Sequence, residues 1–240
     1  MSKPIISIIT AVYNAKEHIE VTIKSIINQS YQNIEFIIVD GGSTDGTIDI
    51  IKKYNSKISY WMSEKDNGVF NAMNKGIEKA NGKWINFMNA GDYFVDENVL
   101  TNIDFHSYVD FGIIYGNTYY EKTGVEKPFI SSSLQYGMIM ACHQSMFFNK
   151  ALLKDKLHYS SKFKLICDYD LICRIINENY PVKYIDLLIA YYMGGGLSSS
   201  KNWEARKARY YFIYKHFKFR GLIKSILESL GLLSLPNKIR

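Results

Sequence analysis

Apolar and polar positions follow two different periods along the first part of the chain. Apolar runs occupy residues 5–14, 34–40, 58–62 and 84–88. Between these runs, apolar residues recur at the three- and four-residue spacing of an amphipathic helix, over 16–29, from 43 or 44 onward, and over 69–80. Strands and helices that alternate at this spacing predict βαβ units and a parallel sheet covered by helices.

Polar residues at the helix starts suggest where each helix begins. We expect Asn14 to cap the first helix, Ser43 or Thr44 to open the second, and Asp66 or Asn67 to cap the third. A single apolar stripe should bury the first helix; its members are Ile19, Ile23, Ile26 and Ile27.

Polar side chains also gather where the predicted strands end. Tyr13, Asn14, Asp40, Asp66 and Asp92 all lie at or just beyond the carboxyl end of a strand. In open α/β sheets, ligands bind in the crevice outside these ends. A single aspartate there is often only a helix cap, but several on one rim predict a binding site.

The stretch VDGGSTDGT (39–47) has two readings of equal weight when it is taken alone. Gly41 and Gly42 could let the backbone approach a ligand, with Asp40 accepting from a ribose hydroxyl or a base N–H. The stretch could equally be an ordinary strand-to-helix turn. It is neither a GxGxxG motif nor a Walker loop, so hydride transfer and P-loop chemistry lose their main support.

Four stretches taken together are more specific than any one of them. They are ISIITAVYNA, SIINQSYQNIEFIIVDGGSTDGT, SEKDNGVFNAMNKGI and GKWINFMNAGD, in this order over residues 5–95. They resemble the nucleotide-binding half of the GT-A glycosyltransferases of family 2. The resemblance implies an α/β fold with a Rossmann-like, mostly parallel sheet flanked by helices, and an inverting, nucleotide-sugar-dependent activity.

The resemblance also implies roles for individual residues. Asp40 and Asp66 match the carboxylates that hold the uracil and ribose of a UDP-sugar, and Asp92 matches the last acid of the family's metal motif. The other residues expected at the donor are Thr10, Val12, Tyr13, Asn14, Gly41, Asn71, Asn89, Ala90 and Gly91. Many members have two or three acids where this chain has Asn-Ala-Gly-Asp. Since Mg²⁺ commonly uses one or two carboxylates plus substrate phosphates, we expect Asp92 to hold Mg²⁺ or Mn²⁺, weakly without donor.

The second half of the chain must supply a base and acceptor contacts. CHQSMFFNK (142–150) resembles a family stretch that lines the active site, which makes His143 and Gln144 candidates for contact with phosphate or acceptor. A lone histidine is as often structural. KLICDYDLICRI (164–175) resembles the region that carries the family's base, which maps onto Asp168, with Asp170 as the fallback. Cys167 replaces the preceding acid, and the alternative role of Asp168 is an N-cap carboxylate.

A glycine-rich loop follows, YYMGGGLSSSKNW (191–203). It could be a plain tether. A comparable family loop folds over the donor, so Gly194–Ser198 is a candidate lid, with Gly195 and Ser198 as candidate phosphate or acceptor contacts.

Length and composition limit the class of protein. The 240 residues are 47% hydrophobic, enough for one domain with an appendage. We divide the chain into a nucleotide-sugar-binding half (1–95), an acceptor-binding and catalytic half (96–200) and a tail (201–240). The three cysteines lack zinc spacing and favour a reducing compartment, with Cys142 a packing residue rather than a ligand beside His143. With no signal-peptide pattern and no membrane-spanning run, we expect a cytoplasmic protein.

The tail carries the positive charge of the chain. Residues 201–240 hold ten Lys and Arg and two Glu, so their net charge is +8. The net charge of the whole chain is +6, which leaves a net charge of −2 for residues 1–200. From Phe219, apolar residues recur on one helical face, at Leu222, Ile223, Ile226, Leu227, Leu230 and Leu233. A basic amphipathic helix on an anionic membrane is favoured for 219–235. Packing on the core or in a homodimer is equally possible for 202–217. No nucleic-acid module is recognisable.

Two hypotheses of different class follow. The first is an inverting glycosyltransferase that moves a hexose from a UDP-sugar to a hydroxyl of a polyprenyl-diphosphate-linked glycan. It would act at the inner face of the cytoplasmic membrane, for a bacterial surface polysaccharide such as O-antigen or capsule. The second is a nucleotide-sugar-binding partner subunit with little turnover, suggested by the thinned metal motif and by Cys167. A Rossmann oxidoreductase is a distant third.

Overall fold

The protein is described by a computed structural model that covers residues 5–160, 162, 165–194, 203–234 and 238. The strands are β1 (Ile6–Val12), β2 (Ile34–Asp40), β3 (Tyr60–Ser63), β4 (Trp84–Phe87), β5 (Tyr93–Phe94), β6 (Ile113–Tyr120), β7 (Gly124–Glu126), β8 (Met146–Asn149) and β9 (Val182–Tyr192). The α-helices are α1 (Ile19–Ile27), α2 (Thr47–Lys53), α3 (Val69–Lys79), α4 (Lys150–Leu153), α5 (Cys167–Asn177) and α6 (Trp203–Ser229). Short 3₁₀ turns are Asn55–Lys57, Ser131–Tyr136, His143–Ser145 and Lys154–Lys156.

One mixed sheet runs through both halves of the chain. Its order is β3-β2-β1-β4-β8-β6-β9-β5, with β7 added to β6. β3, β2, β1 and β4 are parallel, as the apolar runs predicted. β8 then pairs antiparallel with both β4 and β6, whereas β6 and β9 are parallel. The expected α/β fold with flanking helices is confirmed, and the run of four adjacent parallel strands comes from the first half of the chain.

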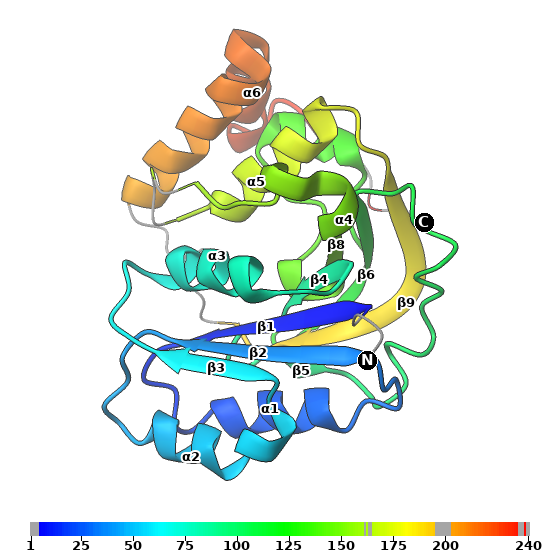
Figure 1. The fold of residues 1–240 in the computed structure, drawn as a ribbon. Helices are drawn as coiled ribbons and strands as arrows, with labels where there is room; N and C mark the ends of the chain where they lie inside the picture. Colours follow the sequence, from blue (N-terminus) through cyan, green and yellow to red (C-terminus); the bar gives the residue numbers. More distant parts are fainter. Residues whose placement is uncertain (1–4, 161, 163–164, 195–202, 235–237, 239–240) are drawn as a thin grey trace.

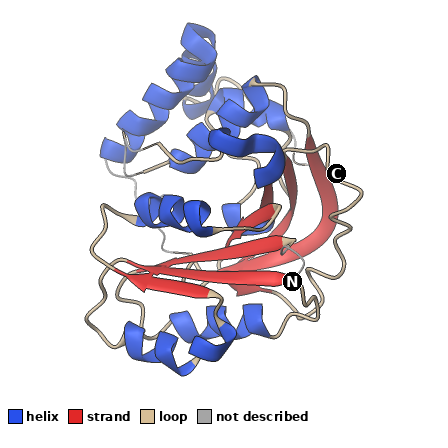
Figure 2. Cartoon of the chain, in the orientation of Figure 1, coloured by secondary structure: helices blue, strands red, loops and turns tan. Residues whose placement is uncertain are grey.

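Helices cover the sheet on both faces (Figure 2). α1 and α2 lie on one side, and α3, α4, α5 and α6 on the other (Figure 1). Because side chains alternate along a strand, Ile8 of β1 joins the core beneath α1, while Ile9 joins the core that reaches α3. The apolar stripe of α1 is buried as predicted at Ile19, Ile23 and Ile26.

The predicted helix caps are wrong in detail. α1 begins at Ile19 rather than near residue 16, and Asn14 does not cap it. Asn14 has φ 45°, and its Oδ1 accepts a hydrogen bond from the Thr44 amide at 2.9 Å. Asparagine tolerates this left-handed backbone better than most residues. Its side chain therefore bonds the neighbouring loop at Thr44 and does not cap α1.

Glycines occupy the N-cap positions of the next two helices. α2 starts at Thr47 after Gly46, with φ 100°, and α3 starts at Val69 after Gly68, with φ 110°. Asp66 does not cap α3; its Oδ1 accepts from the Gly68 amide at 2.8 Å and thereby shapes the turn before the helix.

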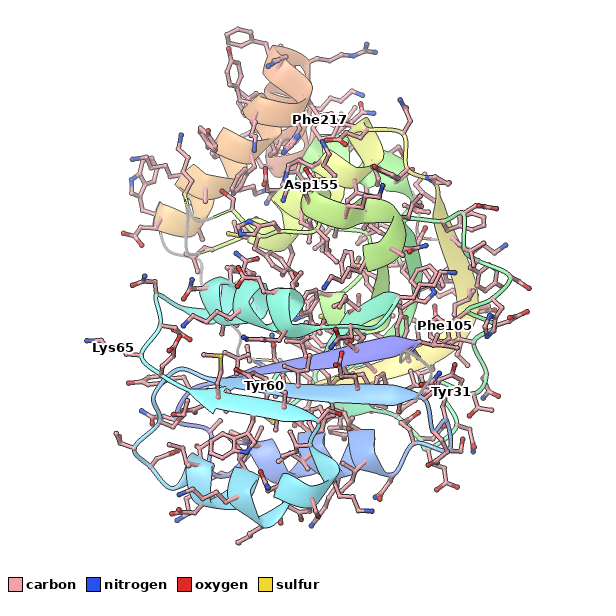
Figure 3. The ribbon with its side chains drawn as sticks, viewed as in Figure 1. Tyr31, Tyr60, Lys65, Phe105, Asp155 and Phe217 are labelled. Carbon is pink, nitrogen blue, oxygen red and sulfur yellow. The ribbon has the colours of Figure 1, made fainter. Side chains whose placement is uncertain are left out.

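The basic tail forms α6, which breaks at Lys218 (φ 54°, ψ −153°). The segment before the break packs on the core of the same chain through Ala205, Ala208, Phe212 and Ile213. Residues 203–217 therefore pack on the core of their own chain, one of the two arrangements that the sequence left open. Figure 3 labels Phe217 near the end of this segment, at the top of the molecule. Of the helices within the described ranges, none has the length and apolarity to cross a bilayer.

Asp170 fastens α5 to α6 and is therefore not a free base. Its side chain is fully buried, and it pairs with Arg174 at 3.1 Å, Lys215 at 2.7 Å and His216 at 2.8 Å. Burial alone would raise its pKa, but His216, Lys215 and Arg174 outweigh burial and lower the pKa to about 2. The fallback role suggested for Asp170 is thus wrong, because its carboxylate is occupied by Arg174, Lys215 and His216.

We expect Asp170→Asn to lower the free energy of unfolding by about 1.5–3 kcal/mol, because it weakens the charge-assisted hydrogen bonds that join α5 to α6. Since the folded pKa is depressed from 3.8 to about 2, the stabilisation is complete above pH 3.8 and is lost as pH falls toward 2. Denaturant unfolding at pH 6 and pH 3 measures this. The gap between wild type and variant should narrow at pH 3, and an equal gap at both pH values would contradict it.

Candidate functional site

The candidate site lies where the sheet changes from parallel to antiparallel pairing. The carboxyl ends of the parallel strands form the left edge in Figure 1, where the β3 arrow points. Lys65, two residues beyond β3, projects from this edge in Figure 3. Because β8 is antiparallel to β4, the start of β8 lies at the end of β4. Asp92 follows β4 and His143–Ser145 precede β8, so the two halves of the chain meet here.

Asp40 organises the loop that follows β2. Its side chain is fully buried, and Oδ2 accepts from the Gly42 amide (3.0 Å), the Ser43 amide (2.9 Å) and the Ser63 hydroxyl (2.6 Å). Oδ1 accepts from the Ser43 hydroxyl at 2.5 Å. The carboxylate therefore holds the loop in shape here, and its contact with a uracil stays a prediction.

Asp66 is brought to the same loop by a glycine. A Cβ on Gly41 would lie 2.9 Å from Oδ2 of Asp66, so glycine lets this carboxylate approach the loop without shifting. Asp66 is partly exposed, unlike Asp40, and is better placed to accept from a ligand. Asn71 lies nearby in the first turn of α3, where its Oδ1 accepts from the Asn67 amide at 3.4 Å.

The residues predicted at the end of β1 differ in their access to the rim. Tyr13 is 65% exposed and Asn14 is exposed. Thr10 is fully buried, and its hydroxyl donates to the Met88 carbonyl at 2.7 Å, so its side chain ties β1 to the end of β4. Val12 is buried in the core beneath α1. The side chains of Thr10 and Val12 therefore do not reach the rim, contrary to the expected donor contacts.

Asp92 is a buried carboxylate held by neutral donors. Oδ1 accepts from the Met193 amide at 3.1 Å, and Oδ2 accepts from the Gln144 side-chain amide. No ion pair between described residues includes Asp92. Burial raises the pKa of Asp92, and the Gln144 hydrogen bond and the nearby His143 only partly oppose this. The preceding residues shape the turn: Ala90 is half-buried, and Gly91 has φ 101°.

The side chain of Gln144 is hydrogen-bonded to Asp92 and is not free to contact a sugar acceptor. It is 1% exposed; its amide nitrogen bonds Asp92, and its Oε1 accepts from the Cys142 thiol at 2.5 Å. The predicted phosphate or acceptor role of Gln144 is thus wrong for the side chain in this arrangement. Burial raises the pKa of the Cys142 thiol, which keeps it protonated and able to donate.

His143 joins the donor side of the site to the predicted base. Its Nδ1 lies 3.0 Å from Oδ2 of Asp168, and its Nε2 lies 3.0 Å from Nδ2 of Asn89. Oδ1 of Asn89 accepts from the Ala11 amide at 3.4 Å, which turns Nδ2 toward the histidine. Nε2 then accepts and Nδ1–H donates to Asp168. Burial lowers the pKa of His143, but Asp168 outweighs burial and the net pKa is raised.

Asp168 lies in the first turn of α5, as predicted, with a side chain 16% exposed. Among the described residues, no hydrogen-bond partner reaches its second oxygen, Oδ1. The buried Tyr159 phenol is nearby; burial and the Asp168 charge raise the pKa of Tyr159 well above its usual value. A carboxylate with one oxygen fixed by His143 and the other without a partner can accept a proton from a hydroxyl.

Two polar residues that support the site were not predicted from the sequence. Thr22 on α1 donates to the Asp92 carbonyl at 2.7 Å and accepts from the Gly91 amide at 2.9 Å. Asn86 in β4 donates to the carbonyls of Gln144 and Met146, both at 2.9 Å. A threonine within the isoleucine stripe and an asparagine within an apolar strand were the available signals, since buried polar groups need partners. Gly195 and Ser198 lie outside the described residues.

The donor set suits a divalent cation shared with a phosphorylated substrate. Within the described ranges, no group of three or more His, Cys, Asp or Glu could hold a metal ion by itself. Asp92, however, is a buried carboxylate that only neutral N–H groups satisfy. Because Mg²⁺ commonly takes one or two carboxylates together with substrate phosphates, this residue fits such an ion.

We expect His143→Leu to lower kcat with little change in the KM for the donor, because leucine cannot donate the hydrogen bond that orients Asp168. A hydrogen bond to a charged group is worth about 1.5–3 kcal/mol, or roughly 10–150-fold in rate. The raised pKa places any acidic limb due to His143 above pH 6.5. That limb should vanish in the variant. Steady-state kinetics across pH measure both effects, and an unchanged pH profile would assign His143 a purely structural role.

Comparison with known proteins identifies the family of the chain. The model of glycosyl transferase family 2 matches residues 7–169. An Escherichia coli protein described as UDP-Glc:alpha-D-GlcNAc-diphosphoundecaprenol beta-1,3-glucosyltransferase WfaP is 30% identical over 95% of this chain and 87% of its own. The putative teichuronic acid biosynthesis glycosyltransferase TuaG of Bacillus subtilis is 37% identical over 43% of this chain and 42% of its own.

Solved structures share the fold. S. aureus TarS 1-349 in complex with UDP-GlcNAc has a TM-score of 0.72 and 18% identity, over 94% of this chain and 72% of that one. Mannosyltransferase PcManGT from Pyrobaculum calidifontis, in complex with GDP-Man and Mn²⁺, has a TM-score of 0.65 and 16% identity, over 98% of this chain and 67% of that one. The chain is therefore a glycosyltransferase of family 2, with the GT-A fold of that family.

Proposed function

We propose that this glycosyltransferase moves a hexose from a UDP-sugar to a hydroxyl of a lipid-diphosphate-linked glycan, with inversion at the anomeric carbon. The product would serve a bacterial surface polysaccharide such as O-antigen or capsule. The observation that carries the proposal is the chain of contacts from Asn89, in the segment before Asp92, through His143 to Asp168. It joins the predicted diphosphate position to the predicted base.

Asp168 would act on the acceptor. Its Oδ1 takes the proton of the attacking hydroxyl while that oxygen bonds to the anomeric carbon. The bond from that carbon to the diphosphate oxygen breaks on the opposite side, and UDP leaves with the electron pair. His143 keeps Oδ2 of Asp168 engaged, which would leave Oδ1, an oxygen without a partner among the described residues, to take the proton.

Asp92 would hold Mg²⁺ or Mn²⁺ together with the donor diphosphate. When bound, the cation offsets the negative charge that grows on the leaving group. Gln144 fixes the orientation of the carboxylate through Oδ2, and the Met193 amide donates to Oδ1. On the nucleotide side, Asp66 and the loop shaped by Asp40 and Asn14 would receive the uridine.

The substrate class is supported by the relatives. WfaP is named for a UDP-glucose donor and a diphosphoundecaprenol-linked acceptor, and it matches over most of both chains. TuaG is named for teichuronic acid biosynthesis, and TarS was solved with UDP-GlcNAc. A polyprenyl-diphosphate acceptor would place the enzyme at the inner face of the cytoplasmic membrane.

A screen of UDP-sugars with Mg²⁺ or Mn²⁺, a synthetic lipid-diphosphate sugar and a readout of released UDP tests the proposal. Acceptor-dependent release from one donor is the expected result. The rival, a nucleotide-sugar-binding partner subunit, is favoured by the full occupancy of both Asp92 oxygens and by Cys167. Donor binding without any wild-type transfer would select the rival.

A further inference from the structure

The part of α6 after its break presents apolar side chains to solvent. Phe219 is 69% exposed, Ile223 56%, Ile226 45% and Leu230, one residue past the helix, 65%. Their spacing of four, three and four residues puts them on one face of the helix. We call these four residues the α6 stripe.

The stripe faces outward because the opposite side of the segment is fixed. Gly221 and Ser225 are buried, and a Cβ on Gly221 would come within 2.4 Å of the Phe217 Cβ and 3.1 Å of Ile213. The close approach leaves no room for a side chain on that side. Gly221 and Ser225 thus mark the buried side of the segment, and the stripe lies on the exposed side.

The surroundings of the stripe are aromatic and cationic. Tyr214, 42% exposed, packs edge-on against Phe219 with ring centroids 5.2 Å apart. Lys218 lies 5.9 Å from the Tyr214 ring, and Arg220 is exposed beside it.

The nearby charges do not cancel these cations. Lys215 is engaged by Asp170, and Lys224 donates to Gln135 at 2.5 Å. Glu228 lies 3.9 Å from Arg209. Lys218 and Arg220 thus leave a local positive excess beside the stripe.

We propose that the α6 stripe, with Tyr214, Lys218 and Arg220, docks this enzyme on an anionic lipid bilayer. Apolar side chains enter the acyl boundary of a bilayer, while cations at their edge meet anionic headgroups. Positive charge next to exposed apolar residues selects such a surface over a second copy of this chain, whose identical patch would repel it. The inference deepens the proposed function, because a lipid-linked acceptor lies in that surface.

The position in the fold suits this role. α6 forms the top of the molecule in Figure 1, on the side of the sheet away from α1 and α2. α6 also packs on α5, the helix that carries Asp168, through Lys215 and His216. Docking through α6 would therefore hold the acceptor side of the site near the lipid surface.

Co-sedimentation of the full chain with vesicles tests the proposal. Wild type should bind phosphatidylglycerol-containing vesicles and bind phosphatidylcholine vesicles more weakly. The double variant Ile223→Ser with Ile226→Ser should lose about tenfold or more in vesicle affinity. Lys218→Gln with Arg220→Gln should lose about tenfold on anionic vesicles and little on neutral ones.

Matched controls lie elsewhere on the surface. Val125→Ser, at a position 56% exposed on β7, and Lys57→Gln, at an exposed lysine, should bind vesicles as wild type does. Unchanged thermal unfolding of the stripe variant, and unchanged UDP release with a short water-soluble acceptor, would show an intact fold and site. Vesicle binding is read without turnover, so it is separate from the test of the proposed function.

Three outcomes would overturn the proposal. The first is wild type that stays in the supernatant with anionic vesicles. The second is a stripe variant that sediments as wild type does. The third is a wild type that forms a dimer in light scattering and does not bind vesicles, together with a stripe variant that is monomeric. That result would assign the stripe to contact with a second copy of the chain.

Discussion

Asp168→Asn should reduce kcat by about 10²–10⁴-fold, the contribution of a positioned general base. The asparagine oxygen can still accept from Nδ1–H of His143, so the local packing is preserved. The substitution removes only the ability to take a proton. We therefore expect the affinity for the UDP-sugar and the thermal unfolding temperature to stay close to those of wild type.

Single-turnover transfer and calorimetric donor binding, measured side by side, check this expectation. Asp155→Asn is the matched control, because Asp155 is an exposed carboxylate on a neighbouring turn (Figure 3). A variant that transfers sugar at the wild-type rate would remove Asp168 from the chemistry. A variant that loses donor binding in proportion to rate would make it a donor-site residue instead.

Asp92→Asn should lower the transfer rate by about 10²–10³-fold, the effect of losing several kcal/mol of charge stabilisation at the leaving group. The response to added Mg²⁺ or Mn²⁺ should flatten at the same time. The free energy of unfolding should be unchanged or higher, because burial disfavours the charge of Asp92 by more than its neighbours offset, as its raised pKa indicates.

Rates with a metal chelator and with graded metal, together with denaturant unfolding, separate these effects. Asp96→Asn, at an exposed carboxylate four residues further on, is the control. Wild-type transfer that persists in excess chelator would show that the leaving group is stabilised without a metal. In that case the effect of Asp92→Asn would have to come from the geometry of its loop.

The sequence predicted the first half of the fold well because that half depends on local pattern. Continuous apolar runs indicated β1, β2 and β4, and parallel strands necessarily bring Asp66 and Asp92 to one edge. Helical periodicity predicted Asp168 at the start of a helix, and the resemblance alone suggested that it is the base. The antiparallel insertion of β8 beside β4 was not predictable, since no local signal encodes long-range pairing.

The misassigned residues share a physical cause. The sequence suggested that Gln144 and Asp170 are free polar groups. In the structure, each is bonded to residues distant along the chain. Asn14 read as a helix cap, but its side chain bonds a loop thirty residues away. Which partner satisfies a buried polar group is decided by tertiary packing. The sequence therefore showed which polar residues are present, but it did not show which hydrogen-bond partner each of them has.

The narrow gap between Gly41 and Asp66 has a consequence for the divergence of this enzyme. Any Cβ at position 41 would press on the Asp66 carboxylate, which the Gly68 amide already restrains. A side chain at position 41 would be accommodated where the carboxylate at position 66 can shift or is replaced by a shorter side chain, so we expect the two positions to change together during evolution.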